Sequence, residues 1–134
     1  MVHSEDVSVR STKRTHWVDI TDEVARVVSV SGVKEGIVMV ASLHTTAGIT
    51  LNENADPDVE RDVFWKLGQL IPQENAYHHV EGNSDSHLKA SLVGLSAHVP
   101  VRGGKPVLGT WQSIYFCEFD GPRNRRVVVT VAGE

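Results

Sequence analysis

The apolar run GIVMVASL at residues 36–43 decides the fold, because it is the clearest strand signal in the chain. Ser42 is its only polar side chain, and His44 follows directly after it. A short and almost wholly apolar run, bounded by glycine and polar residues, is typical of a strand that is covered on both faces. We therefore expect a strand at residues 36–43 that is buried on both sides.

Outward from this run, other segments mix β-branched, aromatic and polar residues in ways that predict further strands. Turn signals such as Gly103-Gly104 and Asp120-Gly121-Pro122 separate some of them. The expected strands lie within residues 6–20, 49–51, 97–101, 107–108, 111–119 and 126–131.

Three segments predict helices. Valines recur at helical spacing after Thr21, which we expect to be the N-cap of a helix over residues 22–31. Asp56-Pro57 is typical of an N-cap followed by proline in the first turn, and the apolar stripe of that second helix ends before Pro72.

The third helix is expected from Ser86 to Gly94, and Leu88, Leu92 and Leu95 fall on one side of it. Strands and helices do not alternate regularly along the chain, which favours an α+β fold with mixed or antiparallel sheet layers, sandwich-like, and helices packed alongside. With 134 residues, the chain has the length of a single domain spanning 1–134.

Composition excludes several kinds of partner. The net charge is −4 and no run of lysines and arginines could follow a phosphate backbone, so we expect no nucleic acid partner. The apolar runs are shorter than the roughly 20 residues that cross a bilayer, so we expect no membrane partner. The N-terminus lacks the features of a secretory signal, which favours a cytoplasmic protein.

Nitrogen and oxygen ligands must hold any metal, because Cys117 is the only cysteine. The chain has 7 histidines, and three of them lie in HHVEGNSDSH at residues 78–87. There His79 and His87 run into an expected helix start, whose amides and Lys89 would attract an anion. The alternative interpretation is a capping loop, in which Ser84 or Asp85 caps the helix and the imidazoles are solvated.

His44 is the third candidate ligand, because it ends the apolar run and is followed by two threonines. Three imidazoles with one open position would form a zinc site, with His44, His79 and His87 as ligands. Glu53 follows another strand and could act as a general base or orient a metal ligand, or could merely cap a helix.

Glu118 shares a strand face with Gln112 in the apolar segment 111–119. A buried carboxylate is costly without a partner, and Arg123 or Arg125 lies within reach in sequence. A structural ion pair is the simplest interpretation.

Five blocks of sequence carry a resemblance that covers nearly the whole chain. They are His44-Thr45-Thr46-Ala47-Gly48, Asn52 to Pro57, His79 to Lys89, Gly109 to Gln112, and Glu118 to Arg123. In this order and spacing the chain resembles the YjbQ-like family.

The resemblance implies an α+β sandwich-like subunit, a homotrimer, and a divalent metal, zinc or, with a diphosphate substrate, magnesium. It implies a secondary thiamine-phosphate synthase activity, which joins a pyrimidine diphosphate to a thiazole phosphate and releases pyrophosphate. The implied metal ligands are His44, His79 and His87, and the implied polar pocket residues are Glu53, Lys89, Trp111, Gln112 and Arg123.

We therefore expect a metal-dependent enzyme that acts on a phosphorylated small molecule. The metal would polarise an oxygen, Lys89 would help to hold a phosphate, Glu53 would move a proton and Trp111 would stack on a planar ring. Metal-assisted hydrolysis of a phosphate or other ester, a non-catalytic metal or metabolite-binding protein, and a purely structural metal remain as alternatives.

Overall fold

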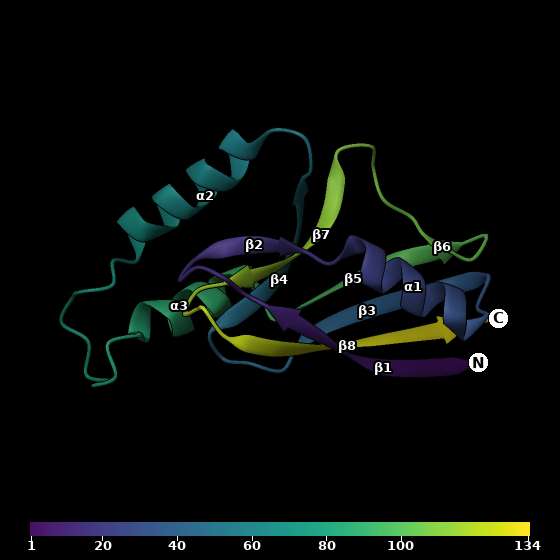
Figure 1. Ribbon diagram of the computed structural model, residues 1–134, viewed down its shortest axis with the longest axis horizontal. Coiled ribbons are helices and arrows are strands. Elements are labelled where there is room, and N and C mark those ends of the chain that lie inside the picture. The colour runs from purple at the N-terminus through teal and green to yellow at the C-terminus, as the bar shows by residue number, and fades with distance from the viewer.

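A computed structural model describes all 134 residues as a single α+β unit, which confirms the expected class (Figure 1). In chain order the elements are β1 (Val2–Arg10), β2 (His16–Asp19), α1 (Thr21–Ser31), β3 (Glu35–Ser42), β4 (Ala47–Glu53), α2 (Pro57–Leu70), α3 (Ser84–Val93), β5 (Ser96–Arg102), β6 (Lys105–Pro106), β7 (Gln112–Glu118) and β8 (Asn124–Gly133).

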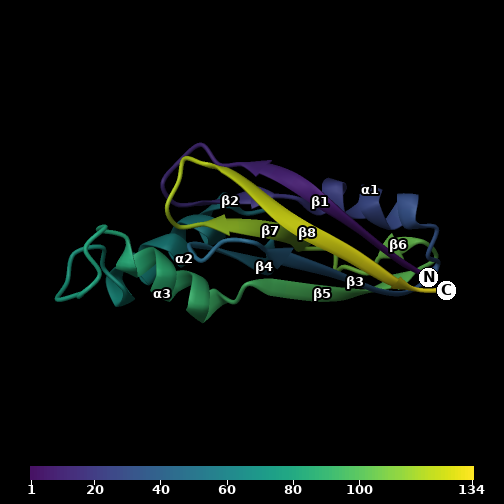
Figure 2. The ribbon, with the colours of Figure 1, turned by 90° about the horizontal axis from the view of Figure 1, so that it is seen from below.

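The strands form two antiparallel sheets that curl around a common core (Figures 1 and 2). The larger sheet has the order β1-β8-β3-β5-β6, and the smaller sheet has the order β2-β7-β4. Both termini lie at the end of the larger sheet that is away from α3 (Figure 1). None of the three helices is long and apolar enough to span a bilayer.

β3 is buried on one face only, so the prediction that both of its faces are covered is wrong. Val38 and Val40 point into the main core, whereas Ile37 is 53% exposed and Met39 is 41% exposed. The apolar composition of the run correctly indicates that both faces of the strand are hydrophobic. It does not indicate whether another element covers each face, and no element of the same chain covers the outer face.

β7 is the strand that is covered on both sides. Ile114 and Phe116 enter the main core, while Tyr115 and Cys117 belong to a second cluster on the other face of the small sheet. Trp17 stacks on Tyr115 in that cluster, with ring centroids 4.6 Å apart. Burial raises the pKa of the Cys117 thiol to about 12, so this cysteine is unreactive at neutral pH.

The first two helices begin close to the predicted positions. α1 starts at Thr21 and buries a valine face, but Thr21 does not cap it, because its hydroxyl accepts the amide of Ile114 at 2.8 Å. Asp56 does cap α2, and its Oδ1 accepts the amide of Asp58 at 2.9 Å. α2 then packs its half-buried apolar side against the second cluster.

α3 lies with its polar side inward. It starts at Ser84, two residues before the predicted start, and buries Asp85, Ser86, Lys89 and Ala90. Leu88 and Leu92 on its opposite side are exposed, and Leu95, which is also exposed, lies beyond the end of the helix at Val93. Hydrophobic periodicity would place the leucine side inward. The ion pairs of the buried charged residues, described below, determine the opposite orientation.

Candidate functional site

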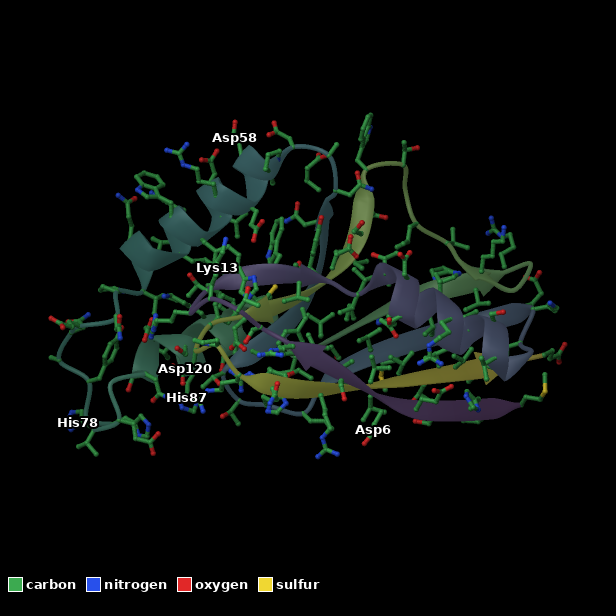
Figure 3. All side chains as sticks on the ribbon, in the orientation of Figure 1. Asp6, Lys13, Asp58, His78, His87 and Asp120 are labelled. Atoms are coloured by element: carbon green, nitrogen blue, oxygen red, sulfur yellow. The ribbon has the colours of Figure 1, made fainter.

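A hollow of about 400 Å³ opens beside the start of α3. Three histidines line it, namely His78, His79 and His87, together with Ser84 and Leu88 among other residues. The loop that carries His78 and His79 joins α2 to α3, and Figure 3 shows His78 and His87 at this end of the molecule, with Asp120 nearby.

His79 and His87 face each other across this hollow. Their ring centroids are 5.3 Å apart and the ring planes are nearly perpendicular, at 88°. Two imidazoles that bind one zinc ion tetrahedrally, with bonds of about 2.0–2.1 Å, place their ring centres about 5 Å apart. The observed separation therefore fits two ligands of a shared metal.

A chain of hydrogen bonds orients His79. The ring Nε2 lies 3.1 Å from Asn83 Oδ1, and the Asn83 amide nitrogen donates to Asp120 Oδ2 at 2.9 Å. Arg123 in turn donates to Asp120 Oδ2 at 3.1 Å. Because Asn83 presents its oxygen, His79 donates from Nε2 and keeps the lone pair of Nδ1 for a ligand.

Buried charges fix α3 beneath the hollow. Asp85 is fully buried and accepts hydrogen bonds from Arg14 at 3.1 Å and from Lys89 Nζ at 2.8 Å. Burial alone would raise the pKa of Asp85, but these two cations outweigh it and lower that pKa. Asp85 is therefore the anchor of α3 and not its N-cap.

The same contacts limit the predicted role of Lys89. Its side chain is 6% exposed and its ammonium group is paired with Asp85. Ser84, the other proposed cap, lines the hollow instead, and no side chain caps α3. An anion at this site would therefore meet the amides of the first helical turn before it met the lysine.

Glu118 has the partner that its burial requires, which is Arg125. Arg125 Nε donates to Glu118 Oε1 at 2.8 Å, its Nη2 donates to the second oxygen, and Ser11 Oγ donates at 2.6 Å. Burial would raise the pKa of Glu118, but these donors lower it overall. Arg123, the other predicted partner, contacts Asp120 instead.

His44 does not join His79 and His87 in this structure. Its Nε2 accepts the amide of Arg126 at 2.9 Å, so the neutral ring has no free lone pair. Burial and then the charge of Arg125 lower the pKa of His44, which keeps the ring neutral. No group of three or more His, Cys, Asp or Glu side chains in the chain is placed to hold a metal ion.

Glu53, Trp111 and Gln112 lie at the other end of the small sheet. Glu53 pairs with Gln112, whereas Ala47, six residues earlier in β4, pairs with Glu118. At about 3.3 Å per residue, the two ends of β4 are about 20 Å apart. The predicted site residues therefore fall into two groups within one chain.

In the second group, Glu53 and Gln112 form hydrogen bonds to backbone amides of nearby residues. Glu53 Oε2 accepts the amide of Ala55 at 3.1 Å, Gln112 Oε1 accepts the amide of Gly109 at 2.8 Å, and Trp111 is 63% exposed. The Glu53 contact resembles the capping alternative more than an active general base.

Three residues of the site were not singled out from the sequence. Asn83 and Asp120 stood within the blocks that carried the resemblance, so a signal for them existed. Arg14 had none, because it contacts Asp85 from 71 residues away. His78 was not among the candidate ligands and also lines the hollow.

The family model described as UPF0047 protein YjbQ-like matches residues 5–134. UPF0047 protein MJ1081 of Methanocaldococcus jannaschii is 50% identical over 126 residues, which cover 94% of this chain and 91% of that protein. UPF0047 protein YugU of Bacillus subtilis is 46% identical over 128 residues, which cover 95% and 97%.

Solved structures agree with the fold. A YjbQ/UPF0047 family protein from Clostridium acetobutylicum, described as uncharacterised, is 49% identical and superposes with a TM-score of 0.94 over 96% of this chain and 99% of that one. A protein of unknown function from Sulfolobus solfataricus is 36% identical, with a TM-score of 0.96 over 100% and 99%. None of these descriptions states an activity. The chain belongs to the UPF0047 protein YjbQ-like family.

Proposed function

We propose that this protein is a metal-dependent enzyme that acts on a phosphorylated small molecule in the hollow at the start of α3. The observation that carries the proposal is the facing pair of His79 and His87, with ring centroids 5.3 Å apart. When bound there, a divalent metal, zinc in the first place and magnesium as the alternative, would polarise a phosphate oxygen. The free amides of the first turn of α3 would bind the same group.

The proposed catalytic unit is a homotrimer in which neighbouring copies complete each site. Two imidazoles do not fill a catalytic zinc shell, which has three protein ligands. The outer face of the larger sheet supports an assembly, because Ile37, Met39, Pro100 and Ala132 are exposed there in adjacent strands. Contiguous apolar surface of this kind marks a protein contact.

Such an assembly would also give a role to Glu53, Trp111 and Gln112, which are about 20 Å from the histidine end of the same chain. In the proposed reaction, which is the thiamine-phosphate synthase type, the thiazole nitrogen would form a bond to the pyrimidine methylene carbon as the bond from that carbon to the diphosphate oxygen breaks. The exposed Trp111 of a neighbouring copy would stack on the pyrimidine, and Glu53 would accept a hydrogen bond from its amino group. Pyrophosphate would leave from the metal side.

A non-catalytic metabolite-binding role is the second candidate. The separation of Glu53 from the histidines favours it, because in one chain the proposed general base does not lie beside the hollow. The two candidates share the metal and the ligand and differ only in turnover.

The test combines metal content with product release. Purified protein is loaded with zinc, dialysed and analysed for metal, and pyrophosphate release is followed with a pyrimidine diphosphate and a thiazole phosphate. We expect His87→Ala to lose bound zinc and turnover, and His3→Ala, which removes a histidine from β1 far from the hollow, to keep both. Zinc binding without turnover in the wild type would favour the binding protein, and unchanged zinc in His87→Ala would refute the proposed site.

A further inference from the structure

Two adjoining hollows lie on the outside of the β1–β8 pair, with volumes of about 410 and 400 Å³. Both are lined by Arg10 and Asn124, which face each other in the strand register. Arg123 lines the first hollow and Arg126 the second, and neither hollow has an Asp or Glu in its lining. We name this surface the arginine trough, defined by Arg10, Arg123, Asn124 and Arg126.

The strand pattern explains why these side chains share one face. Val7 and Val9 of β1 point into the core, so Ser8 and Arg10 point outward. Ser8 pairs with Arg126 and Arg10 pairs with Asn124, and all four residues are exposed. The trough therefore stands on a paired β-ladder, which is a rigid support.

Its charge is positive because Arg10 has no ion-pair partner in the chain. Arg123 contacts Asp120 at 3.1 Å and Arg126 contacts Asp6 at 3.4 Å, so each of these guanidinium groups has one carboxylate beside it. Arg123 bonds to Asp120 through Nε and Nη2, which leaves its Nη1 free to donate.

Arg125 also lines the second hollow but is almost fully buried. Arg125 itself is neutralised by Glu118 beneath the trough.

We infer that the arginine trough binds the phosphate group of a small-molecule ligand, at a site separate from the histidine hollow. The planar fork of a guanidinium group matches phosphate oxygens, and charge-assisted bonds of this kind are strong. Asn124 and Thr12 add neutral donors to the lining. The overall charge of −4 repels large polyanions at a distance, so the trough suits a small anion that can approach Arg10 closely.

Inorganic phosphate is the probe, and calorimetric titration of the full chain at constant ionic strength is the measurement. We expect Arg10→Gln to weaken phosphate binding about tenfold or more, and Arg126→Gln to weaken it as well. The matched control is Arg102→Gln, which removes an exposed arginine without an ion pair at the opposite end of the sheet and should leave the affinity unchanged. Circular dichroism confirms that each variant is folded.

Three results would overturn the inference: no phosphate binding by the wild type, no change in Arg10→Gln, or an equal loss in Arg102→Gln. Vesicles containing phosphatidic acid test a lipid headgroup as the source of the phosphate. We expect no co-sedimentation, and vesicle binding that depends on Arg10 would replace the small-molecule ligand by a lipid. The inference does not rest on the proposed function, since zinc content should be the same in Arg10→Gln and in the wild type.

Discussion

Replacing Arg125 with methionine should destabilise the protein by about 3–5 kcal/mol, the usual cost of leaving one partner of a buried ion pair alone. Glu118 is fully buried and would lose both bonds from Arg125. Only Ser11 Oγ, at 2.6 Å, and the amide of Asp120, at 3.0 Å, would still donate to it. For a chain of 134 residues, this loss corresponds to a fall in Tm of about 11–18 °C.

Urea unfolding at pH 7, followed by circular dichroism, measures the effect. Arg126→Met is the matched control, because Arg126 is the exposed neighbour, and it should cost less than about 1 kcal/mol. The double variant Glu118→Leu with Arg125→Met removes both charges and should recover most of the loss. A loss below about 1 kcal/mol in Arg125→Met, or a double variant no more stable than the single one, would show that the pair is not buried and coupled as described.

Two further predictions concern acid stability and assembly. The folded pKa values of Asp85 and Glu118 are lowered from ordinary values of 3.8 and 4.5, so their contribution is complete above about pH 5 and is lost as the pH falls through the folded pKa values. The pKa values of His16 and His44 are also lowered from 6.5, so urea midpoints should begin to fall below about pH 6.5. They should fall further below about pH 4.5, and that second fall should be smaller in Asp85→Asn. Met39→Glu should dissociate the assembly in sedimentation velocity while Trp65→Glu, an exposed apolar position on α2, should not; a wild-type monomer, or an assembly indifferent to both changes, would contradict the proposed interface.

Local signals were enough to predict much of the fold. The Asp56-Pro57 pair located the start of α2, because capping involves only neighbouring residues. Residues 111–119 carry apolar groups on both faces, and both faces of β7 are covered. The apolar run of β3 predicted the same cover and was wrong, since a hydrophobic face is a property of the sequence, whereas its cover depends on what packs against it.

α3 shows a different limit. Leu88 and Leu92 do share one side of the helix, but that side faces outward, and Leu95 lies beyond the helix end at Val93. Arg14 reaches Asp85 from another part of the chain, and no periodicity within the helix could report that contact.

The sequence predicted correctly those parts of the site whose residues are close together in the chain. His79 and His87 stand on one short segment that runs into a helix, so their proximity followed from spacing. His44 and Glu53 depended on which strand ends meet: the ring of His44 bonds to β8, and Glu53 lies at the far end of β4. The sequence can identify such residues as candidates, but the order of the strands in the sheet determines which residues lie next to them.

The most direct test of the proposed metal site is X-ray absorption at the zinc edge on the zinc-loaded protein. The facing imidazoles of His79 and His87 predict at least two imidazole nitrogens in the zinc shell, at about 2.0–2.1 Å. His87→Ala should lose at least one of them. A shell made only of oxygen, or an imidazole shell that is unchanged in His87→Ala, would contradict the assignment of this hollow as the metal centre.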